Sequence, residues 1–153
     1  MTTDSYAAFL VDLDGTLLGR DERISARVTG AVRTLASRLT VNIVSGREQA
    51  DVVRFARELG LSGPQVSDSG AVIVDSVAGT TVWSNPLEEG DAREIVDVLS
   101  SRGLSFMASH PGGSVTCLDQ ITRWDMTRVT ALDVDEGLAN ELVAGYGANR
   151  GLC

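Results

Sequence analysis

The chain has 153 residues, of which 43% are hydrophobic and 22% are charged, and this composition is typical of a soluble globular domain. It carries 21 acidic residues against 13 cations, and because every cation is Arg, the net charge of −8 arises without any Lys. The lack of Lys excludes a P-loop and a Schiff-base lysine, and a single His excludes an HExxH zinc site. The acidic balance and the dispersed Arg side chains argue against nucleic acid as a partner.

Targeting signals and Cys usage bear on where the protein works. We see no secretory signal at the polar N-terminus, and no apolar stretch approaches the roughly 20 residues that span a bilayer. Cys117 and Cys153 form no disulfide framework and fit a reducing compartment. We therefore expect a cytoplasmic protein with no membrane partner.

The first part of the chain alternates between predicted strands and helices. The apolar run 7–11 predicts a strand buried on both faces, as in the middle of a parallel sheet. Apolar residues recur at helical spacing from Ile24 to Leu39, and Ser25 is placed to cap this helix. A second strand over 40–44 precedes a helix whose apolar stripe is Val52, Phe55, Ala56 and Leu59. This alternation predicts a parallel sheet with right-handed crossovers.

The rest of the chain contains shorter elements and a second unit. Short strands are predicted over 65–67, 71–75 and 80–83. From about residue 85 we expect a helix over 92–99, strands over 104–108, 114–118 and 128–134, and a last helix over 138–146. The expected fold class is α/β, with a partial Rossmann-like parallel sheet over 1–84 and a second α/β domain over 85–153.

The residues that can carry chemistry begin where the first predicted strand ends. Asp12 and Asp14 stand two positions apart, so an extended backbone directs both carboxylates to one side, and Gly15 permits a tight turn. Open α/β sheets bind ligands at this edge. Two adjacent carboxylates suit Mg²⁺ completed by a substrate phosphate, and one of them can attack phosphorus while the other exchanges a proton. The alternative is a solvated turn whose Asp residues cap a helix.

A second candidate group follows the second predicted strand. Ser45 offers a hydroxyl and Gly46 an amide just before a predicted helix, which is a favourable place for a phosphoryl oxygen. Two strand ends then converge on one phosphate. Two alternatives stay open at this point: Ser45 as a plain N-cap, and Arg47 as either a substrate contact or a surface partner of Glu48 or Asp51.

These segments resemble motifs of the haloacid dehalogenase superfamily. Residues 12–18, DLDGTLL, look like its motif I, and residues 44–47, VSGR, look like its motif II. Residues 68–71, DSGA, resemble the acidic-Asn-Gly-Ala turn of the Cof-like and sugar-phosphate phosphatases, in which an α/β cap of type IIB is inserted between motifs II and III. The likeness covers essentially the whole chain, and implies the first half of a core over 1–84 and a cap over 85–153.

The resemblance implies a Mg²⁺-dependent phosphatase acting on a small phosphorylated metabolite such as a sugar phosphate. Asp12 would be the nucleophile that forms an aspartyl phosphate, and Asp14 the general acid/base. The Asp12 carboxylate and the Asp14 backbone carbonyl would hold Mg²⁺, and Ser45 would hydrogen-bond the phosphoryl group. The implied phosphate site also includes Gly15, Gly46 and Arg47. A phosphomutase on the same fold and a catalytically incomplete phosphate-binding protein are the alternatives.

Three departures from the superfamily pattern lead to a further expectation. Members carry a Lys or Arg in motif III and an acidic pair in motif IV after the cap, but this chain has no Lys and no such acidic segment after Val134. Ser69 also replaces the usual Asn. We therefore expect the chain to end inside or just after the cap, without the second half of the core. The first strand would then be an open edge, and we expect a homodimer or another partner to cover it.

Overall fold

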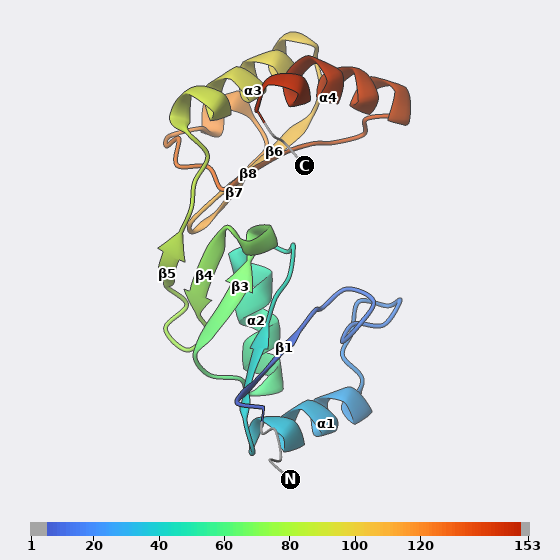
Figure 1. Cartoon of the computed structure of the whole chain (residues 1–153), viewed down its shortest axis with the longest axis vertical. Helices are drawn as coiled ribbons and strands as arrows, with labels where there is room; N and C mark the ends of the chain where they lie inside the picture. The colour runs from blue at the N-terminus through green and yellow to red at the C-terminus, as the bar shows by residue number, and fades with distance from the viewer. Residues whose placement is uncertain (1–5, 151–153) are drawn as a thin grey trace.

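The computed structural model of the chain describes residues 6–150, which form two regions lying one beyond the other along the long axis (Figure 1). We refer to residues 6–84 as the N-terminal region and to residues 85–150 as the C-terminal region. Each region has its own hydrophobic cluster: the first includes Leu13, Ile43 and Phe55, and the second includes Val96, Phe106 and Met126. The mixed α/β fold class expected from the sequence is confirmed.

The N-terminal region begins with a parallel pair of strands joined by a helix. Strand β1 (Ala8–Val11) pairs with β2 (Thr40–Ile43), and helix α1 (Ala26–Ala36) connects them. The Ser25 hydroxyl accepts a hydrogen bond from the Val28 backbone N–H at 3.3 Å, so the predicted N-cap is confirmed. Val28 and Val32 of the predicted stripe pack against the first hydrophobic cluster.

The second helix, α2 (Gln49–Leu59), packs against the strands that follow it. All four residues of its predicted stripe are buried, and it ends at Gly60, whose φ of 75° is a left-handed conformation that glycine adopts without strain. An antiparallel meander follows, made of β3 (Pro64–Ser67), the short 3₁₀ turn η1 (Asp68–Gly70), β4 (Val72–Asp75) and β5 (Thr81–Ser84). A parallel bridge between Val44 and Val66 places β3 beside the end of β2.

Strand β1 is much less buried than its sequence predicts. Among residues 6–150 it pairs only with β2, and the side chains of Phe9 and Leu10 remain 46% and 65% exposed. The prediction of a strand buried on both faces is therefore wrong for this chain. The physical reason is that no described element lies along the outer edge of β1, which is the open edge that the sequence also led us to expect.

The C-terminal region places two helices against a small antiparallel sheet (Figure 1). Its elements are α3 (Glu89–Ser101), β6 (Phe106–His110), β7 (Gly113–Val115), the 3₁₀ turn η2 (Leu118–Gln120), β8 (Arg128–Ala131) and α4 (Glu136–Arg150), with strand order β7-β6-β8. The strand predicted over 114–118 ends at Val115, because the chain turns into η2, and Cys117 is exposed. Within the described residues, none of the helices is both long and apolar enough to cross a bilayer.

Candidate active site

Asp12 and Asp14 follow the end of β1, where the chain makes a tight turn. Both residues are exposed, whereas Leu13 between them is fully buried, so the backbone directs the two carboxylates away from the hydrophobic cluster. The Leu13 carbonyl accepts hydrogen bonds from the Leu17 and Leu18 amides at 3.0 and 2.8 Å, which closes the turn. Gly15 has a φ of 74°, so the turn needs glycine at this position, as the sequence indicated.

Backbone hydrogen bonds bring the ends of three strands together beside this turn. The Val44 amide donates to the Val11 carbonyl at 2.9 Å, and the Ser45 amide donates to the Val66 carbonyl at 3.1 Å. The loop that starts at Ser45 therefore lies next to the end of β1. This arrangement is the one expected when the carboxyl ends of parallel strands meet at one edge of a sheet.

The Ser45 to Arg47 loop has hydrogen-bond donors without partners. Ser45 is 4% exposed, and its Oγ accepts from the Arg47 amide at 3.2 Å but donates to no group in residues 6–150. Gly46 is exposed, and its amide makes no hydrogen bond within the described chain. Helix α2 begins only at Gln49, with Glu48 as its N-cap residue, so the alternative that Ser45 caps this helix is wrong.

Arg47 is surrounded by carboxylates. Its Nε and Nη2 atoms form a forked contact with the Asp14 carboxylate, with the shortest distance 2.8 Å. Its Nη1 lies 3.2 Å from Asp51, and Glu22 lies 3.6 Å away. Of the two acids named for a surface pairing with Arg47, Asp51 forms it, whereas Glu48 accepts a hydrogen bond from Ser114 at 2.8 Å. Sequence reasoning missed the contact with Asp14 because the two residues are 33 positions apart.

The contact between Arg47 and Asp14 changes the acidity of both groups. The hydrogen bonds from Arg47 lower the pKa of the Asp14 carboxyl, and Asp14 raises the pKa of the Arg47 guanidinium. Asp14 is therefore held in its ionised form in this arrangement. Donation of a proton by Asp14 requires this contact to loosen first.

The η1 turn packs against the same loop and contains a buried acid. The Asp68 amide donates to the Arg47 carbonyl at 2.9 Å, and the Ser69 amide donates to the Ser45 carbonyl at 3.2 Å. The Asp68 side chain is 2% exposed; its Oδ2 accepts from Ser67 at 3.2 Å, but its Oδ1 makes no hydrogen bond. Burial raises the pKa of this carboxyl. Ser69 has a left-handed φ of 56°, which is the conformation that Asn, the residue usual in the resembling motif, adopts more readily than Ser.

The C-terminal region reaches this edge through Arg128. The Arg128 Nη1 donates to the Gly46 carbonyl, and its Nη2 lies 3.5 Å from Ser109 Oγ and 3.8 Å from Asp68 Oδ1. Arg128 was not among the candidate residues. It is 82 positions from Gly46 in the chain and is the first residue of β8, and no local sequence pattern there indicates a functional residue.

The donor set at the turn bears on whether Mg²⁺ fits. Residues 6–150 contain no group of three or more His, Cys, Asp or Glu side chains placed to hold a metal. Mg²⁺ needs fewer protein ligands, because it is commonly bound through one or two carboxylates together with water and substrate phosphate. The Asp12 carboxylate suits this role, since it is exposed and has no partner in the described chain, whereas the Asp14 carboxylate is engaged by Arg47. The residues present fit a Mg²⁺ site completed by its ligand.

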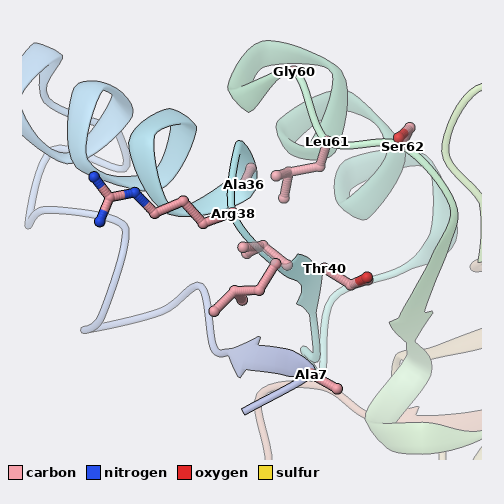
Figure 2. A pocket seen from close by; sticks show the side chains of 9 residues that line it. Ala7, Ala36, Arg38, Thr40, Gly60, Leu61 and Ser62 are labelled. Carbon is pink, nitrogen blue, oxygen red and sulfur yellow. The ribbon is translucent and has the colours of Figure 1, made fainter. Parts of the chain in front are cut away.

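A hollow elsewhere in the N-terminal region is separate from this edge. It has a volume of about 460 Å³ and is lined by residues that include Ala7, Thr40 and Leu61 (Figure 2). Ala7 and Thr40 stand at the amino ends of β1 and β2, which is the opposite end from Asp12 and Ser45. Because parallel sheets bind ligands at their carboxyl ends, this hollow is not part of the candidate site.

Comparisons with known proteins connect this geometry to a family. The family model for haloacid dehalogenase-like hydrolases matches residues 9–137. A phosphoglycolate phosphatase of Thermoplasma acidophilum is 33% identical over 67 residues, which are 43% of this chain and 30% of that protein. A haloacid dehalogenase-like hydrolase from Bacteroides thetaiotaomicron has a TM-score of 0.65 at 23% identity, covering 73% of this chain and 44% of that one.

A third similar protein is a sugar phosphatase of subclass IIB of the same superfamily. Its structure has a TM-score of 0.60 at 17% identity, again over 73% of this chain and 44% of that one. The chain thus spans less than half the length of each of these relatives. Because the family match runs through both regions and includes the strand that leads to Asp12, the chain belongs to the haloacid dehalogenase-like hydrolase family.

Proposed function

We propose that this chain carries the nucleophile and the phosphate-binding loop of a cytoplasmic phosphatase that acts on a small phosphorylated metabolite, such as a sugar phosphate. The observation that carries the proposal is the position of Asp12. Its carboxylate is exposed and has no partner in the described chain. It follows the end of β1, and beside this strand end the Ser45 hydroxyl and the Gly46 amide donate no hydrogen bond within the described chain. A nucleophile next to unused N–H and O–H donors is the arrangement that phosphoryl transfer requires.

The proposed reaction proceeds in two displacements. Once the contact with Arg47 has loosened and Asp14 is protonated, an Asp12 carboxylate oxygen attacks phosphorus, the bond from phosphorus to the ester oxygen breaks, and the leaving alkoxide takes a proton from Asp14. Water then attacks the aspartyl phosphate and gives a proton to Asp14, which releases inorganic phosphate and restores the Asp12 carboxylate. Ser45 O–H and Gly46 N–H donate to the phosphoryl oxygens during both displacements. Mg²⁺, bound by the Asp12 carboxylate and the Asp14 carbonyl, would supply charge neutralisation.

The relatives support the substrate class and the division of the chain. Two of them are named as phosphatases of phosphoglycolate and of sugar phosphates, which are both small phosphorylated metabolites. We propose that residues 1–84 form the first half of the catalytic core and residues 85–153 form a cap. The separate hydrophobic clusters of the two regions support this division.

Hydrolysis of p-nitrophenyl phosphate in the presence of Mg²⁺ tests the proposal. We expect turnover that falls by about 10³-fold or more in Asp12→Asn, because the substitution removes the nucleophile. Ser45→Ala removes one donor to the phosphoryl group and should lower kcat by about 10²-fold. The matched control is Asp97→Asn, an exposed acid on α3, which should leave turnover unchanged.

Two outcomes would contradict the proposal. Turnover that survives in Asp12→Asn would show that another group is the nucleophile. No turnover by a folded wild-type chain that still binds inorganic phosphate would instead support the alternative of a phosphate-binding protein. Circular dichroism and thermal unfolding of each variant check that the fold is intact.

A further inference from the structure

Arg128 joins the two regions at the loop that we propose binds phosphate. Its side chain is 26% exposed and extends from the first residue of β8 to the carbonyl of Gly46. The carbonyl of Gly46 belongs to the same short loop as the unpartnered Gly46 amide and Ser45 hydroxyl. The Arg128 guanidinium is thus held next to the donors on which a phosphoryl oxygen would rest.

The charge around the loop distinguishes Arg128 from Arg47. Arg47 has three carboxylates within 3.6 Å, from Asp14, Asp51 and Glu22, so its positive charge is already compensated. The Arg128 Nη2 is 3.8 Å from Asp68 Oδ1, the only carboxylate partner of Arg128 in the described chain, so its charge is less closely compensated. A phosphate dianion therefore gains more from Arg128 than from Arg47.

Two buried atoms at this position have no hydrogen bond. Arg128 Nε is a donor without an acceptor, and Asp68 Oδ1 is an acceptor without a donor. Leaving a buried polar group unsatisfied destabilises the fold, so native proteins rarely retain two of them near one another without a use. An anionic oxygen bound at the loop would give the guanidinium a further acceptor, while Asp68 Oδ1 lies 3.8 Å from its Nη2.

We propose that Arg128 is a substrate-binding residue that supplies the cation for the phosphoryl group held by Ser45 and Gly46, with Asp68 positioning its guanidinium. This inference rests on the proposed function, because it assumes that the Ser45 to Arg47 loop binds phosphate. It assigns to the C-terminal region a direct role in binding the group that is transferred. The ligand class is a phosphate monoester or free phosphate.

Binding of inorganic phosphate to the full chain, measured by calorimetry, tests the role of Arg128 without relying on turnover. We expect Arg128→Gln to weaken phosphate binding by about 10- to 100-fold, the range that a hydrogen bond to a charged group provides. Arg128→Lys keeps the charge and should recover part of the affinity. Equal affinity of wild type and Arg128→Gln, within 2-fold, would overturn the inference.

Two control variants separate charge from structure. Arg102→Gln removes the same charge from the end of α3, where Arg102 pairs with Glu141 at 2.8 Å, and should leave phosphate affinity unchanged. Ser114→Ala breaks another hydrogen bond between the regions, from the Ser114 hydroxyl to Glu48, without removing a cation. If Ser114→Ala weakens phosphate binding as much as Arg128→Gln does, Arg128 only holds the regions together and the inference is overturned.

The Ser45→Ala variant distinguishes failure of this inference from failure of the proposed function. Weaker phosphate binding in Ser45→Ala but not in Arg128→Gln would support the proposal that the Ser45 to Arg47 loop binds phosphate. It would overturn the role of Arg128. Absence of phosphate binding by the wild-type chain contradicts the proposed function and the inference together.

A measurement on the wild-type chain avoids dependence on the folding of Arg128→Gln. Phenylglyoxal modifies accessible Arg side chains, and mass spectrometry locates each modified residue. Inorganic phosphate should slow modification of Arg128 but not of Arg102, whose side chain is 41% exposed. Modification of Arg128 at the same rate with and without phosphate would overturn the inference.

Discussion

Strands β1 and β6, one from each region, differ in how many of their residues are buried. Every residue of β1 is apolar, yet only Val11 is buried, because β1 has one strand neighbour among the described residues. Strand β6 contains Ser109 and His110, yet Phe106, Ala108 and Ser109 are buried, because β7 and β8 flank it and α3 packs in the same hydrophobic cluster. The neighbours of a strand, and not its own composition, decide how much of it is buried.

The regions also differ in the chemistry they carry. In the N-terminal region, polar side chains collect where strands end, at Asp12, Asp14 and Ser45. In the C-terminal region, the side chains that reach this edge are Arg128 and Ser114, both from the small sheet. At this edge the first region therefore offers carboxylates and hydrogen-bond donors, and the second offers a cation.

The largest expected effect tests whether the two hydrophobic clusters are energetically separate. Phe55 is 1% exposed in the first cluster, and Phe55→Ala should lower the free energy of unfolding by about 3–5 kcal/mol. Hydrogen exchange should then accelerate in α2 and β2 while β6 and α3 keep their protection. Phe106→Ala in the second cluster should give the reverse pattern, and equal loss of protection in both regions would show that they unfold as one unit.

The next prediction concerns the buried carboxyl of Asp68. The charged groups of Arg128 and Glu48 face this carboxyl. An ordinary Asp has a pKa of about 3.9, and burial raises the pKa of Asp68 in the folded chain. Its contribution to stability is therefore complete below about pH 4 and is lost as the pH rises through the folded pKa.

Asp68→Asn removes this titration while keeping the size of the side chain. Between pH 4 and pH 7, the free energy of unfolding of the wild type should fall relative to that of Asp68→Asn by on the order of 1 kcal/mol. Urea denaturation at several pH values measures the difference. A difference that stays constant, or that grows in favour of the wild type, would contradict the direction of the shift.

A smaller effect concerns the acidity of Asp14. Arg47→Gln removes the forked contact, so the pKa of Asp14 should rise toward its ordinary value. NMR titration of the side-chain carboxyl carbons measures this pKa directly. Arg54→Gln is the matched control, because Arg54 pairs with Asp51 at 2.8 Å and makes no contact with Asp14. An equal rise in both variants would mean that the contact with Arg47 is not the cause.

The smallest effect tests the open edge of β1. Leu10 is 65% exposed, so Leu10→Lys should change the free energy of unfolding by no more than about 0.5 kcal/mol if this face is bare in solution. Val82→Lys, on the exposed face of β5, is the control at 64% exposure.

Light scattering on the same variants tests the homodimer predicted from the sequence. A wild-type dimer that dissociates in Leu10→Lys but not in Val82→Lys would support coverage of the β1 edge. A wild-type chain that stays monomeric at high concentration would contradict it.

Local signals in the sequence predicted most of the elements and part of the site. The spacing of Val52, Phe55, Ala56 and Leu59 identified α2, Ser25 marked the start of α1, and Gly60 marked an end. The turn at Gly15 and the meeting of the strand ends that precede Asp12 and Ser45 followed from the placement of polar residues after apolar strands. These features depend on residues close in the chain or on the general geometry of parallel sheets.

The sequence by itself therefore determined the α/β fold class, the family and the candidate residues Asp12, Asp14, Ser45 and Gly46. Only the tertiary structure decided that Arg47 is compensated by three carboxylates, that Arg128 stands at Gly46 and that Asp68 is buried with one carboxylate oxygen that makes no hydrogen bond. The exposure of β1 was also decided there. The physical reason is common to all of these: charge compensation and burial depend on groups that are distant in the chain, and no local pattern records which distant groups become neighbours.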